Sequence, residues 1–445
     1  MRSPLVRPAV LVLAIAGVLG SNAAASAATE PPAPPVADRG EFVAGLRTDT
    51  GVLEVFGRDG GLVRTVETGA EGALRFAGTY GSVVALLDAA NGTVHVVDLA
   101  GDEVAVIDVP PGSNALQPAR SAVLVLAPLD GSAPPVVVDL AGATAVDLGS
   151  LDVELPYGQP AYDLTRAFVS PDGSVVGLID LLSPTSVLVR LGGAGSEASA
   201  VAAAGTLLGL TDESASLVDP EAGVVQYVGP DGTVTHSFAL PEHVAAVSLA
   251  GGAAILFDPD GTMWGVPGDP TGAAVDLGDL GLDPLDVSVL TPVGDGEQFA
   301  AGTFDGSLLV FDSEGSQLGE ISGVDATAPQ LPPEADDRCL PFGFEAVTLA
   351  DTEALVAVDA GPGTVGARSA DGCIVAVSGP EATRIVGAAA DFDTIELDAG
   401  AEVPAVGPDG SAAVVTDATG THLVGLDGDT SVTLDTIATA FVFVG

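Results

Sequence analysis

A short apolar segment that lies between two turns recurs at nearly regular intervals along most of this chain. The first seven copies begin 41, 41, 52, 38, 38 and 45 residues apart. A strand this short cannot bury its own apolar faces, so successive copies must pack on one another. The copies are Gly51-VLEVFGRDG, Gly92-TVHVVDLAG, Ala133-PPVVVDLAG, Thr185-SVLVRLGG, Gly223-VVQYVGPDG, Gly261-TMWGVPGDP, Gly306-SLLVFDSEG and Thr421-HLVGLDGD.

The turns beside these segments share a Pro-Asp-Gly-Ser/Thr signature. It occurs at residues 171–174, 230–233, 259–262 and 408–411, and shorter Asp-Gly turns occur at 59, 130, 305 and 371. Proline presets φ for a turn, and glycine accepts the positive φ that closes it. Because β-branched runs flank most of these turns, they predict β-hairpins and an all-β chain.

The repeated segments resemble the blades of β-propeller proteins, in the style of WD-type and YVTN-like repeats, over residues 42–445. The match is one of pattern, because the Gly-His and Trp-Asp dipeptides of WD repeats and the Asp box of sialidase-like propellers are missing. The resemblance implies a single ring of four-stranded blades, and the repeat length predicts seven or eight of them. The alternative is a tandem array of β-sandwich domains, which repeat at about 100 residues.

Two features near the C-terminal end bear on how such a ring is built. The apolar segment at residues 438–444 is expected to close the ring by pairing with the first strand near Phe42. The regular spacing breaks after Leu308, and the Pro-rich segment at residues 325–344 is interpreted as a long loop insertion.

The first 27 residues have the layout of a secretory signal peptide. Arg2 and Arg7 precede an apolar run at residues 10–19, and Ala-Ser-Ala at 25–27 fits the cleavage rule. An uncleaved anchor is the alternative, although the apolar run is too short to span a bilayer stably. Residues 28–41 form a Pro-rich linker, and residues 42–445 form the propeller domain. We therefore expect a secreted, extracellular or periplasmic protein without membrane insertion after cleavage.

The charge of the chain is strongly negative. Its 13 basic residues are all arginine, against 61 acidic residues, and its net charge is −48. Removing the two arginines of the signal peptide gives 11 − 61 = −50. Such a surface repels nucleic acids and anionic membranes, and we interpret it as a source of solubility rather than as an acidic binding site. A saline habitat would also account for it. The absence of lysine excludes P-loop and Schiff-base chemistry.

Cys339 and Cys373 are the only cysteines. In an exported protein an even pair predicts a disulfide, here one that ties the end of the expected loop insertion to the next hairpin. A metal site is the rival interpretation, and two thiols without a nearby histidine make a poor one.

Metal-ligand residues are scattered along the chain. The best zinc-type candidates are His236, Glu242 and His243, whose histidine spacing of seven fits no standard short motif. Asp-rich turns at 258–261 and 427–429 and the acidic run Asp276, Asp279, Asp283 and Asp286 offer oxygen ligands for Ca²⁺. Ordinary turn capping and a solvated face are the favoured explanations. No cofactor is predicted.

The sequence contains no convincing catalytic motif. It lacks G-x-S-x-G, and aromatic residues make up only 4% of the chain, which argues weakly against an extended sugar cleft. We therefore expect a monomeric, non-catalytic scaffold that binds an unidentified small ligand or extracellular protein. Two alternatives remain open. One is an extracellular hydrolase or lyase with carboxylates in the propeller channel, and the other is a metal-handling accessory protein of an uptake system.

Overall fold

The computed structural model describes residues 42–444 apart from short breaks. The breaks are 71–72, 101–103, 117–121, 129, 152–164, 171, 181–184, 193–197, 220, 241, 244, 250–251, 280–285, 295, 327–329, 331–336, 344–345, 390–391 and 427–429. The predicted signal peptide and linker lie outside the described residues. Within these residues no helix combines the length and the apolar character that crossing a membrane requires.

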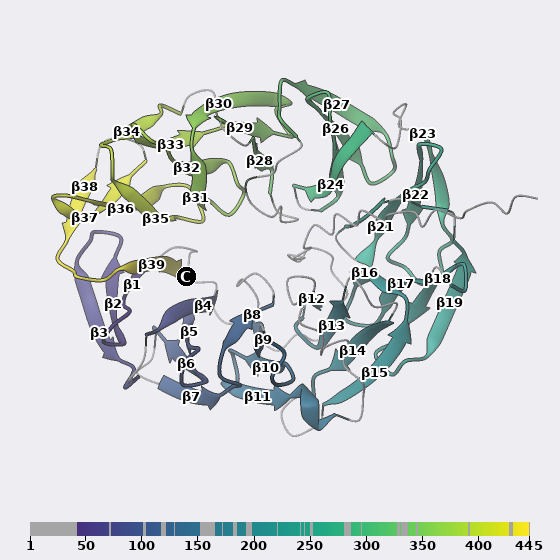
Figure 1. Ribbon diagram of the computed structural model, residues 1–445, viewed down its shortest axis with the longest axis horizontal. Coiled ribbons are helices and arrows are strands. Elements are labelled where there is room, and N and C mark those ends of the chain that lie inside the picture. Colours follow the sequence, from purple (N-terminus) through teal and green to yellow (C-terminus); the bar gives the residue numbers. More distant parts are fainter. Residues whose placement is uncertain are drawn as a thin grey trace, which may run out of the picture.

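Ten antiparallel sheets stand around a common axis, so the fold is a single β-propeller (Figure 1). We number its blades 1 to 10 in chain order. Where Figure 1 labels it, the innermost strand of a blade lies nearest the axis. In order from blade 1, the innermost strands are β39 (Ala440–Val444), β4 (Arg75–Tyr80), β8 (Ser113–Ala115), β12 (Thr165–Val169), β16 (Thr206–Leu210), β20 (Ala245–Ser248), β24 (Val287–Val293), β28 (Cys339–Phe342), β31 (Thr364–Arg368) and β35 (Glu402–Val406).

In most blades the second strand is deeply buried, as its near-continuous apolar sequence suggests. In β5, for example, Val84 and Leu86 face blade 1 while Ala85 and Leu87 face blade 3. The second strands are β1 (Phe42–Arg47), β5 (Val83–Asp88), β9 (Val123–Pro128), β13 (Val175–Asp180), β17 (Ala215–Asp219), β21 (Ala254–Phe257), β25 (Gln298–Thr303), β29 (Ala346–Asp351), β32 (Ile374–Ser378) and β36 (Ala412–Asp417).

The third strands contain the segment that recurs in the sequence. They are β2 (Val52–Gly57), β6 (Thr93–Asp98), β10 (Val136–Asp139), β14 (Thr185–Arg190), β18 (Val224–Val228), β22 (Thr262–Val266), β26 (Ser307–Asp312), β30 (Val356–Pro362), β33 (Thr383–Gly387) and β37 (Gly420–Gly425).

The fourth strands form the outer rim and are largely exposed. They are β3 (Leu62–Glu67), β7 (Val104–Asp108), β11 (Thr144–Asp147), β15 (Ser199–Ala204), β19 (Val234–Ala239), β23 (Val275–Asp279), β27 (Gln317–Ser322), β34 (Ile395–Leu397) and β38 (Ser431–Leu434). Nine sheets have four strands, and blade 8 has three strands among its described residues. A 3₁₀ turn, η1 (Leu148–Ser150), follows β11.

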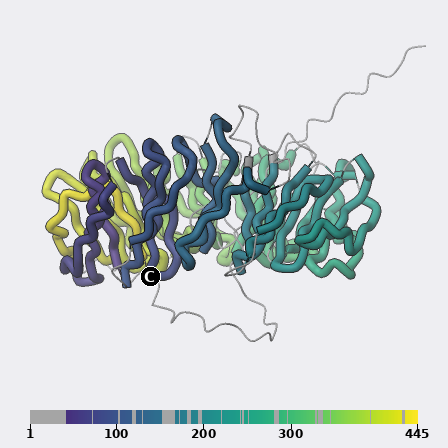
Figure 2. The backbone as a smooth tube through the Cα atoms, turned by 90° about the horizontal axis from the view of Figure 1, so that it is seen from below, coloured from purple at the N-terminus to yellow at the C-terminus, as the bar shows by residue number. Residues whose placement is uncertain are grey.

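The ends of the described chain meet in one sheet and close the ring. β39 pairs antiparallel with β1, with Val444 opposite Phe42, so blade 1 is built from both ends of the chain. The expectation that residues 438–444 pair near Phe42 is therefore confirmed. Figure 2 shows the ring from the side, with the strands running across its thickness.

The hydrophobic core is divided into ten clusters, and each lies between two adjacent blades. One cluster joins blade 10 to blade 1 through residues such as Leu423 and Phe56. A ring is thus closed by packing as well as by strand pairing, and burial between blades is the main stabilising contribution. Because each sheet packs on two neighbours in this way, the tandem-sandwich alternative is wrong.

The predicted number of seven or eight blades is also wrong, because the structure has ten. The eight sequence copies are all third strands, and the two that the pattern missed are β30 and β33. β30 is largely exposed, and β33 is five residues long and interrupted by Arg384. The prediction of a loop insertion over residues 325–344 is wrong for the last part of that segment, because β28 there forms the first strand of blade 8.

Candidate functional site

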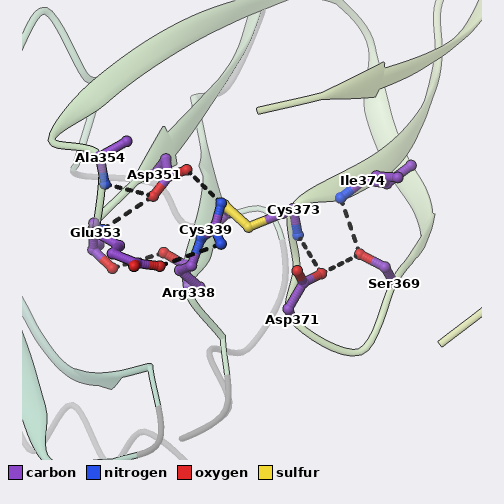
Figure 3. The surroundings of a disulfide bond; sticks show 10 residues. Arg338, Cys339, Asp351, Glu353, Ala354, Ser369, Asp371, Cys373 and Ile374 are labelled. Carbon is purple, nitrogen blue, oxygen red and sulfur yellow. Dashed lines mark hydrogen bonds and ion pairs between the residues drawn. A yellow bond between two sulfur atoms is a disulfide. The ribbon is translucent and has the colours of Figure 1, made fainter. Parts of the chain in front are cut away.

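The junction between blades 8 and 9 combines buried carboxylates, arginines and both cysteines of the chain. The predicted disulfide is present there and is confirmed (Figure 3). It joins Cys339, at the start of β28, to Cys373, directly before β32, with 4.8 Å between the Cα atoms. Both residues are buried. The bond therefore links two blades covalently, and Cys339 and Cys373 belong to the same apolar cluster between those blades.

A buried carboxylate lies beside the disulfide. Asp351 is opposite Cys339 in the β28–β29 pair and is 1% exposed. Its Oδ1 accepts hydrogen bonds from the backbone N–H groups of Glu353 and Ala354, at 3.0 and 2.9 Å. The Arg338 guanidinium lies 2.9 Å from Asp351 Oδ2 and 3.2 Å from Glu353 Oε2. The hydrogen bond to Asp351 raises the pKa of Arg338, so the guanidinium stays ionised.

The turn that contains Cys373 is held in place by hydrogen bonds to Asp371. Asp371 Oδ1 accepts hydrogen bonds from Cys373 N at 3.0 Å and from Ser369 Oγ at 2.6 Å. The Asp371 carbonyl oxygen accepts the N–H groups of Arg338 and Cys339. This close approach requires Gly372, whose φ is +71° and where a Cβ would lie 2.2 Å from the Cys339 carbonyl oxygen. The sequence Asp-Gly-Cys at 371–373 therefore forms the hairpin turn and also makes contacts that join blade 9 to blade 8.

A second ion pair crosses the same junction. Arg368 Nη1, at the end of β31, lies 2.6 Å from Asp337 Oδ2, just before β28. Asp337 is fully buried. Other arginines also act at blade seams: Arg64 donates to the Asp98 carbonyl between blades 1 and 2, and Arg75 donates to the Ser113 carbonyl between blades 2 and 3.

Two carboxyl groups meet at the turns of blades 4 and 5. Asp212 Oδ1 accepts a hydrogen bond from Asp172 N at 3.0 Å, and the two carboxyl groups also interact directly. Burial raises the pKa of Asp212, and the negative charge of Asp172 raises it further. Burial opposes ionisation of Asp172 too, but hydrogen bonds, chiefly from Ser174, lower its pKa overall. One member of the pair is therefore the better acid and the other the better base.

This pair does not stand out in the sequence. Asp172 lies in one of the Pro-Asp-Gly-Ser turns and Asp212 in the corresponding turn of the next blade, 40 residues later. That separation is one repeat length. The Asp172–Asp212 pair could have been found by aligning the turns of successive blades at the repeat period.

Among the described residues, the zinc-type candidates do not form a group of ligand atoms close enough to hold a metal ion. His236 lies in β19 on the outer rim, where its ring centroid is 6.3 Å from those of both Tyr227 and Phe238. Glu242 is exposed and His243 is half-buried in the connection to blade 6. Across the described ranges, the one group of three ligand residues close enough to hold a metal is Cys339, Asp351 and Cys373. It does not include His236, Glu242 or His243.

In the Asp-rich turns, the carboxylates accept hydrogen bonds from backbone N–H groups a few residues later in the chain. Asp258 Oδ1 accepts the N–H groups of Asp260 and Thr262, and Asp276 Oδ1 accepts the N–H group of Gly278. The same arrangement recurs at Asp231 and Asp409. Residues 283 and 427–429 lie outside the described residues. Calcium binding at such turns stays a prediction.

A shallow cleft lies on the rim between blades 1 and 2. Its volume is about 270 Å³, and its lining includes Arg64, Glu67 and Asp98. His95, in β6, is buried at the same seam and is 4% exposed. Burial lowers the pKa of His95, opposed in part by the Thr68 backbone and the Asp88 carboxylate, so the imidazole is neutral at pH 7.

Comparison with known proteins reveals distant likeness only. No protein-family model matches the chain, and no curated protein matches its sequence significantly. One similar solved structure is a eukaryotic initiation factor, with a TM-score of 0.48, 10% identity, and coverage of 90% of this chain and 97% of that chain. Another is the dihydro-heme d1 dehydrogenase NirN, with a TM-score of 0.41, 14% identity, and coverage of 94% and 78%. BamB from Moraxella catarrhalis has a TM-score of 0.34, 13% identity, and coverage of 71% and 95%. Likeness at this level supports no conclusion about what this chain binds.

Proposed function

We propose that this chain is an exported, non-catalytic propeller scaffold that binds a ligand or protein at the cell exterior. The observation that carries the proposal is the structural use of its charged groups. Arg64, Arg75 and Arg368 bridge neighbouring blades, and carboxylates such as Asp231 and Asp409 cap turns. Charged side chains that join blades and cap turns make the ring rigid. A rigid ring holds its connecting loops in position to contact a partner.

Two further features support export and the type of ligand. A disulfide persists in an oxidising compartment, which agrees with the predicted signal peptide. The net charge of −48, interpreted above as a source of solubility, also creates a negative potential that attracts cationic ligands and repels anionic ones. We therefore propose a cationic small molecule or a basic protein surface as the ligand class.

Export and binding can be tested separately. The full chain, expressed with its N-terminal segment, is expected to be released with a new N-terminus at residue 28. The released protein is then screened by thermal shift against Ca²⁺, Zn²⁺, neutral sugars, polyamines and polyanions, because a ligand of the native state raises the melting temperature. A salt-sensitive shift with polycations supports the proposal. Retention of the chain inside the cell, or a response restricted to polyanions, contradicts it.

A hydrolase or lyase is the second candidate function, and the Asp172–Asp212 pair is the observation that favours it. Two neighbouring carboxyl groups with opposite pKa shifts can divide the roles of acid and base in a hydrolysis. The released protein is assayed for hydrolysis of a panel of aryl glycosides and esters. Activity that is lost in Asp212→Asn but kept in Asp231→Asn, a control turn on blade 5, establishes an enzyme. Absence of hydrolysis across the panel leaves the scaffold proposal in place.

A further inference from the structure

The disulfide at the junction of blades 8 and 9 has the surroundings of a metal site. Single donor atoms from Cys339, Cys373 and Asp351 lie within 4.8 Å of one another, and all three residues are buried. We propose that reduction of this disulfide creates a Zn²⁺ site formed by the two thiolates and the Asp351 carboxylate. The junction would then be held by a covalent bond in the oxidised chain and by a metal ion in the reduced chain.

The donor set suits zinc. Zn²⁺ binds Cys sulfur at about 2.3 Å and carboxylate oxygen at about 2.0–2.2 Å, usually with four ligands, so one water would complete the site. The three protein ligands come from two blades: Cys339 and Asp351 from blade 8, and Cys373 from blade 9. A bound ion would therefore bridge the same two blades as the disulfide does.

The ligands are held in place by contacts that do not depend on the sulfur–sulfur bond. The Glu353 and Ala354 N–H groups fix the Asp351 carboxylate, and the Asp371 carboxylate fixes the backbone of Cys373 (Figure 3). Two thiolates and one carboxylate would leave a net charge of −1 with Zn²⁺. The Arg338 guanidinium, 2.9 Å from Asp351 Oδ2, lies where it offsets that charge.

The redox step is balanced by an added phosphine or dithiol reductant. The disulfide accepts two electrons and two protons, its S–S bond breaks, and two thiols form while the reductant is oxidised. Zn²⁺ then displaces the two thiol protons, because the thiolate is the metal ligand. In the oxidised chain the sulfurs carry no thiolate charge. The disulfide and the zinc site therefore exclude one another.

The first experiment compares metal binding by the oxidised and reduced chain. The protein is unfolded with a phosphine reductant and refolded anaerobically with or without Zn²⁺, in excess Ca²⁺ to occupy exposed carboxylates. We expect one Zn²⁺ per reduced chain after dialysis and none at this site in the oxidised chain. With Co²⁺ in place of Zn²⁺, we expect thiolate-to-metal charge-transfer bands in the reduced chain alone. Equal binding by both forms, or a reduced chain that fails to refold with or without Zn²⁺, overturns the proposal.

Two matched variants test the carboxylate ligand. Asp351→Asn is expected to weaken Zn²⁺ binding by the reduced chain about tenfold or more, with the thiolate bands retained. Asp359→Asn changes an exposed carboxylate of the same blade that caps only the Gly361 N–H group and is outside the ligand group, and it is expected to leave the affinity nearly unchanged. Circular dichroism confirms that each variant is folded. If Asp359→Asn weakens binding as much as Asp351→Asn, or if neither changes it, Asp351 is not a ligand.

Discussion

Gly45 lies directly opposite Phe441 in the β1–β39 pair that closes the ring. The Phe441 ring occupies the space beside the glycine, and a Cβ at position 45 would lie 2.8 Å from Phe441 Cε1 and 3.0 Å from Ala438 Cβ. The C-terminal strand is therefore fitted to blade 1 by side-chain shape as well as by backbone hydrogen bonds. Ring closure depends on this contact because β39 is the only described strand that joins the end of the chain to its beginning.

Gly45→Ala is expected to destabilise the folded ring. The added methyl group overpacks the closing contact, which typically costs about 1–3 kcal/mol. Chemical denaturation measures the loss, and Phe441→Leu in the same chain is expected to restore part of it. The control is Gly366→Ala in β31, where a Cβ would meet no atom within 4 Å. Equal stability of the two alanine variants would show that β39 adjusts freely to blade 1.

Replacing both cysteines by serine is expected to lower the free energy of unfolding by about 3–4 kcal/mol. The disulfide closes a segment with a sequence separation of 34, and cross-linking a loop of that length limits the conformations of the unfolded chain. Denaturation of the oxidised wild type and of the double serine variant, both without metal, measures the difference. A difference below about 1 kcal/mol would mean that the Arg368–Asp337 ion pair and the apolar cluster hold the junction by themselves.

Arg368→Met is expected to be far more damaging than removal of an exposed arginine. It leaves the Asp337 carboxylate buried without the guanidinium 2.6 Å away, and breaking a buried pair costs about 3–5 kcal/mol. Arg58→Met, which removes an exposed pair with Asp409 at 3.5 Å, is expected to cost less than about 1 kcal/mol. The combined Arg368→Met and Asp337→Asn variant is expected to regain stability. A double variant no more stable than Arg368→Met would contradict the buried-charge explanation.

Much of the fold could be predicted because the blade is a repeated unit. Turn residues and an apolar third strand are local features, so eight of the ten blades are visible in the sequence. β30 and β33 lack that signature. Their positions in the ring depend on contacts with neighbouring blades and not on an apolar run in the sequence. The closing strand could be predicted because the apolar segment at residues 438–444 needs a pairing partner, which β1 supplies at the other end of the described chain.

The candidate site was predictable only in its covalent part. Because the chain has only two cysteines, a disulfide could only join Cys339 to Cys373, but Asp351 is one of 61 acidic residues and nothing nearby in the sequence marks it. Its position depends on the β28–β29 register, which places it opposite Cys339. The Arg368–Asp337 pair likewise depends on how two blades meet. Contacts between blades are set by ring geometry, and the sequence period alone does not encode them.

His95 is expected to make the stability of the ring depend on pH below neutrality. Its pKa is lowered from 6.5 by burial, so the unfolded chain binds a proton more readily than the folded chain. The contribution is fully present above pH 6.5 and is lost as the pH falls from 6.5 toward the folded pKa. Denaturation at pH 7.5 and pH 5 measures this loss in wild type and in His95→Gln. Because both chains share every carboxylate, the difference isolates the imidazole. We expect wild type to lose more stability than His95→Gln, and equal losses would mean that His95 takes up its proton without opening the seam between blades 1 and 2.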